Sequence, residues 1–137
     1  MASLINEINK LNFTDFPNII SCSCRAILEL SYDTLLAHGK ILPQNKKVEF
    51  IDRLDSIIKV LYDNLSHIVN GDPKTFNSFH DEQNFLYTFD EAKFKSINGK
   101  LNSAAHKSSK NVNLIELEEC IRKDISRLVA LINQLLK

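Results

Sequence analysis

Apolar residues recur at alternating spacings of three and four in two long segments, and this periodicity limits the possible folds more than any other feature. Such spacing places the apolar side chains on one face of an α-helix, whereas a strand would require alternation at every second residue. From about 46 to 69 the repeating positions are Ile51, Leu54, Ile58, Leu61, Leu65 and Ile68. From about 114 to 136 they are Ile121, Ile125, Leu128, Ile132 and Leu135. Both segments are predicted to be long amphipathic helices.

Two more long helices are predicted, from about 17 to 38 and from about 90 to 107. Pro17 suits a first helical turn, and His38-Gly39 suits a helix end. The helix over 17–38 is apolar almost all round, which predicts a buried, central position. In the helix over 90–107, Gly99 either weakens the helix or marks a close approach by another helix.

The remaining segments are shorter. Residues 3–11 are predicted to form a short first helix, and the aromatic-rich segment 74–89 is predicted to be a loop or short helix that caps the core. The fold class is therefore all-α: a helical bundle of four long helices plus a short N-terminal helix. A chain of 137 residues is expected to form one domain, residues 1–137.

Composition excludes several classes of protein. The 17 basic and 17 acidic residues balance, so the chain lacks the overall positive charge of a general nucleic-acid binder. The odd count of three cysteines predicts free thiols and a reducing, cytoplasmic location. No apolar run approaches the length of a membrane span. No spacing of ligand residues predicts a metal site, and no motif predicts a cofactor.

Two polar stripes interrupt these apolar helices. Arg25, Glu29 and Tyr32 share one face of the helix over 17–38, and Asn102 and His106 share one face of the helix over 90–107. Each stripe has an ordinary explanation, an exposed ion pair in one case and a histidine at a helix edge in the other. Each also suits a site, because an unpaired charge on a buried helix is costly and a second polar patch would satisfy it.

The pairing of Arg25-x-x-x-Glu29 with a later Leu101-Asn102-x-x-x-His106 resembles the HEPN superfamily of helical domains. The likeness covers roughly residues 17–136 and is to the branch that includes bacterial anticodon nucleases and related domains of defence proteins. The chain departs from the superfamily at Leu101, where an Arg-Asn-x-x-x-His version carries an arginine. Lys100 offers only a partial substitute, because lysine lacks the planar fork of arginine.

The resemblance implies metal-free cleavage of RNA through the ribose 2′-hydroxyl. His106 would be the general acid or base, and Arg25 would hold the scissile phosphate. Glu29 would orient Arg25 or transfer the second proton, and Asn102 would position the phosphate or the imidazole. The same superfamily includes inert modules, so a non-catalytic dimerisation or partner-binding role stays open beside the ribonuclease.

The sequence also predicts binding partners for the chain. A homodimer is expected, because the last helix and the helix over 17–38 carry more apolar surface than a monomer of this size readily buries. The four site residues are expected to converge near its axis. The resemblance further implies RNA as substrate and an antitoxin or an ATPase as partner protein, in a bacterial defence or toxin system.

Overall fold

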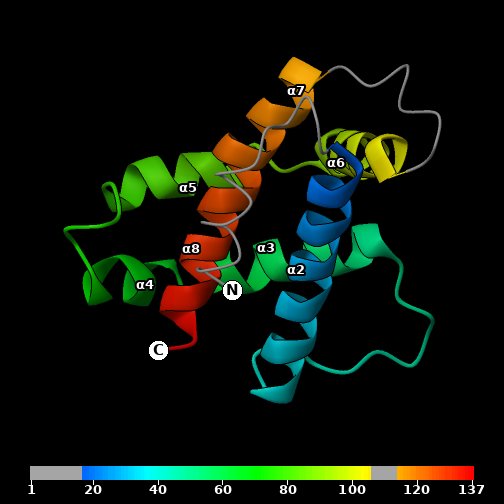
Figure 1. Ribbon diagram of the computed structural model, residues 1–137. Helices are drawn as coiled ribbons and strands as arrows, with labels where there is room; N and C mark the ends of the chain where they lie inside the picture. The colour runs from blue at the N-terminus through cyan, green and yellow to red at the C-terminus, as the bar shows by residue number, and fades with distance from the viewer. Residues whose placement is uncertain (1–16, 106–113) are drawn as a thin grey trace.

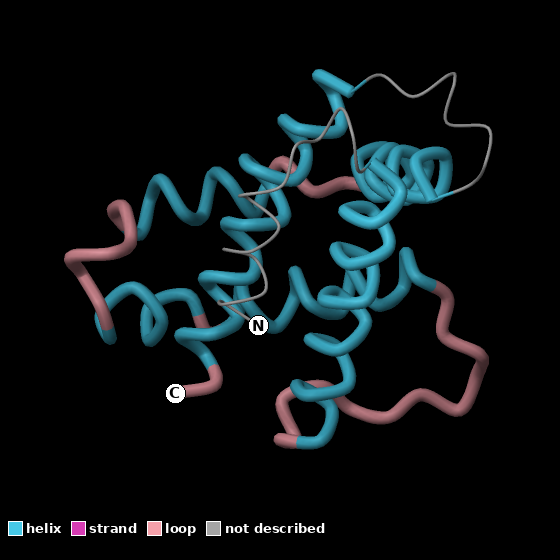
Figure 2. Tube along the Cα trace, in the orientation of Figure 1, coloured by secondary structure: helices cyan, strands magenta, loops and turns pink. Residues whose placement is uncertain are grey.

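The computed structural model describes residues 17–105 and 114–137 of the chain, and these residues contain helices and no β-strand (Figures 1 and 2). The all-α prediction is therefore confirmed for the described residues. The helices are α2 (Pro17–Ala37), α3 (Phe50–Asp63), α4 (Leu65–Gly71), α5 (Phe79–Tyr87), α6 (Glu91–Ala105), α7 (Leu114–Glu119), the π-helical η2 (Cys120–Ile125) and α8 (Ser126–Leu135). The predicted helix over 3–11 lies outside the described residues.

The last three elements follow one another as a single rod through the molecule (Figure 1). On one side of this rod α2 packs against α6 and α3, and on the other side α4 packs against α5 and α8. This arrangement gathers one core from all the helices. Its fully buried side chains include Ile20, Leu28, Leu54, Leu61, Ile97, Leu101, Ile121 and Leu128.

The helix predicted from about 46 to 69 is two helices. The first of these, α3, begins only at Phe50. The backbone N–H of Glu49 donates to the Asp52 carboxylate at 3.1 Å, and this bond caps the start of the helix. It ends at Asp63, because Asn64 departs from helical geometry with φ −110° and ψ 12°, and the Asn64 side chain donates to the carbonyl of Val60 at 2.8 Å. The apolar face continues across this break into α4, so the periodicity located the buried side correctly.

The central position predicted for α2 is confirmed only in part, and the burial of the last helix differs from the prediction. One side of α2 is exposed, with Ile19 at 57% and Leu30 at 53% of their full exposure, because α3, α6 and α8 pack on its other sides. The last helix is more deeply buried within the chain than expected, because Leu117, Val129 and Leu131 all lie in the chain's own core. At the start of this rod, however, Ile115 on α7 keeps 74% of its full exposure, and the homodimer stays a prediction.

The π-helical turn within the last rod was not predicted. Its wider turn is held by the hydroxyl of Ser126, which donates to the carbonyl of Ile121 at 3.0 Å. Such turns are rare and often occur at functional sites. Within the described parts of the chain, no helix combines the length and the apolar character needed to cross a membrane.

Candidate functional site

The polar stripes of α2 and α6 face each other. Nη1 of Arg25, on α2, donates to Oδ1 of Asn102 at 2.7 Å and to Oδ1 of Asn98 at 2.8 Å. The two asparagines lie one turn apart on α6, where Nδ2 of Asn102 donates to Oδ1 of Asn98 at 3.3 Å. Two amide side chains on α6 thus accept hydrogen bonds from one guanidinium on α2, and these bonds fix the orientation of Arg25.

An aromatic ring supports the same guanidinium from α3. The central carbon of the Arg25 guanidinium lies 4.2 Å from the centroid of the Phe50 ring, within the range of a cation–π contact. The Arg25 side chain keeps 30% of its exposure. It is therefore held by three helices and still reaches solvent.

A second arginine joins the site from α3. Oε1 of Glu29 lies 3.4 Å from Nε of Arg25 and 3.6 Å from Nη1 of Arg53. The Glu29 and Arg53 side chains are 38% and 31% exposed. Arg53 also lies over the buried ring of Tyr32, at 5.9 Å from its centroid. We call Arg25, Glu29 and Arg53 the arginine cluster, which carries two positive charges and one negative charge.

The structure thus brings three of the four predicted site residues together, namely Arg25, Glu29 and Asn102. Their catalytic role stays a prediction. His106 lies outside the described residues, so its place beside the other three also stays a prediction. Leu101 is fully buried in the core, which means that this position directs an apolar side chain inward and offers the site no polar group.

Sequence reasoning missed three contributors. Asn98 had a signal, because it precedes Asn102 by one helical turn and so shares its face. Phe50 and Arg53 had none, because their contacts with α2 depend on how α3 packs against it. That packing is a tertiary feature that no local spacing reveals.

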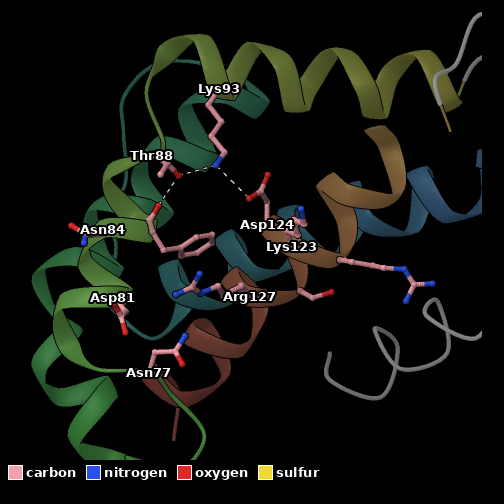
Figure 3. Close-up of a pocket in the computed structure, with 11 residues that line it drawn as sticks. Asn77, Asp81, Asn84, Thr88, Lys93, Lys123, Asp124 and Arg127 are labelled. Atoms are coloured by element: carbon pink, nitrogen blue, oxygen red, sulfur yellow. Dashed lines mark hydrogen bonds and ion pairs between the residues drawn. The ribbon is translucent and has the colours of Figure 1, made fainter. Parts of the chain in front are cut away.

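A second polar cluster surrounds a cavity of about 950 Å³ between α5, the start of α6 and the rod. Lys93 points between Thr88 and Asp124, with Nζ at 2.7 Å from Oγ1 of Thr88 and 3.3 Å from Oδ1 of Asp124 (Figure 3). Below them Arg127 reaches the buried carboxylate of Glu82 at 2.6 Å. This cluster is separate from the arginine cluster, because positions 93 and 102 are about 2.5 turns apart and so face opposite sides of α6.

The two thiols in the core, Cys24 and Cys120, stay protonated near neutral pH and so are poor nucleophiles. Burial raises the pKa of the Cys24 thiol to about 12, and burial also raises the pKa of Cys120 to about 11. All three cysteines are free, and only Cys22 is exposed. In residues 17–105 and 114–137, no three His, Cys, Asp or Glu side chains gather closely enough to hold a metal ion.

Comparison of the chain with protein-family models, with curated proteins and with solved structures found no match.

Proposed function

We propose that the chain is an HEPN-like helical domain of a bacterial defence or toxin system, and that it cleaves RNA without a metal ion. The observation that carries the proposal is the contact between the two motifs: Arg25 donates to Asn102 while it pairs with Glu29. Residues far apart in the sequence thus meet in one partly exposed polar cluster. This meeting was expected from the cost of burying unmatched polar groups on two apolar helices.

The proposed reaction needs three things from the protein. A base must take the proton of the ribose 2′-hydroxyl as its oxygen attacks the adjacent phosphorus. A cation must stabilise the charge that grows on the non-bridging oxygens, and an acid must give a proton to the departing 5′-oxygen. The products are a 2′,3′-cyclic phosphate and a free 5′-hydroxyl, so atoms and protons balance without a cofactor.

Each residue then has a stated role. His106 serves as the general acid or base, since an imidazole changes protonation near neutral pH. Arg25 grips the phosphate, and its guanidinium matches two phosphate oxygens at once. Glu29 orients Arg25 or acts as the second proton-transfer group. Asn102 holds Arg25 and positions the phosphate or the imidazole.

Replacement of His106 by alanine tests the proposal. The purified chain is incubated with total RNA and with a defined oligoribonucleotide in the presence of EDTA, and cleavage products are separated by electrophoresis. The wild type is expected to cleave and His106→Ala to be inactive, with the same helical content by circular dichroism. His67→Ala is the matched control, because His67 is exposed on α4, away from the site, and should leave cleavage unchanged. Equal cleavage by wild type and His106→Ala would refute the assignment.

A non-catalytic dimerisation or partner-binding module is the second candidate, and two observations favour it. Leu101 is buried where the superfamily's usual arginine would stand, and Arg25 is already bonded by two amides and stacked on Phe50, as in a purely structural polar contact. In that case the wild type cleaves no RNA.

The proposed partners are a second copy of the chain and an antitoxin or ATPase, in the cytoplasm. The exposed apolar side of α2, with Ile19 and Leu30, is the surface that still supports a homodimer. Light scattering at tens of micromolar protein measures this directly, and a strict monomer would count against the dimer in both candidate functions.

A further inference from the structure

The arginine cluster holds its carboxylate loosely. Charge-assisted contacts between guanidinium and carboxylate normally measure about 2.7–2.9 Å. Here the same oxygen of Glu29 lies 3.4 Å from Arg25 and 3.6 Å from Arg53. A single anionic oxygen therefore sits between two guanidiniums without a close bond to either.

The guanidinium of Arg53 also has a donor that the described residues leave without an acceptor. Its Nε is buried and has no hydrogen-bond partner among the described residues. A guanidinium offers five N–H donors, and a buried donor without an acceptor is costly. Arg25 differs, because its Nη1 serves both Asn98 and Asn102. Arg53 thus lacks an acceptor at its buried Nε among the described residues, and the exposed part of its side chain is what an anion from solvent would meet.

Charge and exposure point to what that acceptor is. Two guanidiniums facing one carboxylate leave an excess of one positive charge, in a chain whose formal net charge is zero. All three side chains are 30–38% exposed, so an anion from solvent can reach them. Paired guanidiniums favour oxyanions with several oxygens, and a phosphodiester can satisfy both arginines where one carboxylate oxygen does not.

We propose that Arg53 is a second phosphate-binding residue, and that Arg25 and Arg53 hold one phosphodiester between them in the place that Glu29 occupies in the structure. Glu29 competes with the incoming anion for both guanidiniums and moves aside when the anion binds, so with the phosphate bound it can act as the second proton-transfer group but does not orient Arg25. That the phosphodiester belongs to an RNA backbone rests on the proposed function, whereas the binding of a phosphodiester rests on the cluster alone.

Binding is measured with a probe that the proposed reaction cannot cleave. A fluorescein-labelled oligodeoxythymidylate has phosphodiesters and no 2′-hydroxyl, and its anisotropy on titration with the full chain gives an affinity. Arg53→Gln is expected to weaken binding about tenfold, the loss of one charge-assisted contact. It should also lower the dependence of log affinity on log salt by about 0.7, the value for one phosphate contact on a single strand.

Glu29→Gln gives the opposite and more distinctive result. Removing a competing negative charge about 5 Å from the bound phosphate should tighten binding about fourfold at low salt. A purely structural role for Glu29, in which it only props up the two arginines, predicts weaker binding instead. Arg122→Gln is the matched control, because it removes an arginine that pairs with Glu118 on the rod, and it should change affinity less than twofold.

Affinity unchanged in Arg53→Gln, or weakened in Glu29→Gln, would overturn the inference. If Arg53→Gln fails to fold by circular dichroism, the Glu29→Gln result decides, since that variant keeps both arginines. Different results would refute the phosphodiester site and the proposed ribonuclease. A wild type that cleaves no RNA, with both binding shifts present, removes the ribonuclease and leaves the phosphodiester site. A wild type that cleaves RNA, with neither binding shift, removes only the role of Arg53.

Discussion

Removal of Arg127 should destabilise the protein more than removal of any exposed cation, because it leaves a buried carboxylate without its partner. The Glu82 side chain is only 2% exposed, and its Oε1 receives Nη2 and Nε of Arg127 at 2.6 and 3.2 Å. Its Oε2 has no hydrogen-bond partner among the described residues. Arg127 is therefore the principal partner of a charge that the core cannot otherwise solvate, and the bond ties α5 to α8.

The magnitude follows from the exposure of the two partners. Breaking a buried ion pair by removing one member costs about 3–5 kcal/mol. Arg127 is 34% exposed, so water can enter when it is lost, and the lower end of that range applies. The cation–π contact of Arg127 with Phe85, at 4.2 Å, is also lost. Arg127→Met, which keeps the apolar stem, should thus lose about 3 kcal/mol of unfolding free energy. Its melting temperature should fall by about 10 °C.

Urea denaturation at pH 7, followed by circular dichroism, measures the loss. Lys95→Met is the control, because Lys95 pairs with Glu91 at 3.1 Å on an exposed surface, and such pairs contribute about 0.2–0.5 kcal/mol. The double variant Glu82→Leu/Arg127→Met should recover most of the loss, since it removes the stranded charge. Equal stabilities for Arg127→Met and Lys95→Met would refute the reasoning, as would a double variant no more stable than the single one.

The remaining predictions concern glycines and thiols. Gly99→Ala should raise the unfolding free energy by about 0.5–1 kcal/mol in urea titration, because an added Cβ meets nothing within 4 Å and alanine favours a helix interior. Gly39→Ala should lower it by about 1 kcal/mol, because Gly39 has φ +72° at the end of α2; a gain in stability would contradict this. In the native state at pH 8 a maleimide should label Cys22, while Cys24 and Cys120 should react only after unfolding; native labelling of all three would disprove their burial. Since the two buried thiols have pKa values of about 12 and 11 against an ordinary 9.0, the unfolded chain releases their protons first, so unfolding free energy should fall as pH rises from about 9 toward 12.

Periodicity predicted the buried faces of this protein better than the ends of its helices. The apolar positions from Leu54 to Ile68 are all buried, although the helix is interrupted between them. The interruption is confined to Asn64, a residue that is compatible with either outcome, and the backbone N–H groups of Asn64 and Ile68 keep their i→i−4 bonds across it. The apolar spacing does not reveal the π-helical turn either. One extra residue in a single turn only rotates the apolar positions that follow it around the helix axis, and the spacings of three and four continue.

The candidate site was predictable in part for a related reason. Spacing places Arg25 beside Glu29 and Asn102 one turn from Asn98, since these relations lie within single helices. That the two helices face each other was inferred from the cost of burying unmatched polar groups, and the bond from Arg25 to Asn102 agrees with that inference. The contribution of Arg53 required the packing of α3 on α2. No energetic argument from sequence selects that arginine over the others.

The two charged clusters on either side of α6 differ in ways that separate a structural role from a binding role. The Glu82–Arg127 pair has a short contact, one carboxylate for one guanidinium, and a carboxylate closed to solvent. The arginine cluster has long contacts, two guanidiniums for one carboxylate, and three partly exposed side chains. Each cluster contains one buried polar atom without a hydrogen-bond partner among the described residues, Oε2 of Glu82 and Nε of Arg53, so the two clusters differ in contact length, charge balance and exposure. The longer contacts, the excess positive charge and the exposure of the arginine cluster support the proposal that Arg25 and Arg53 bind an outside anion.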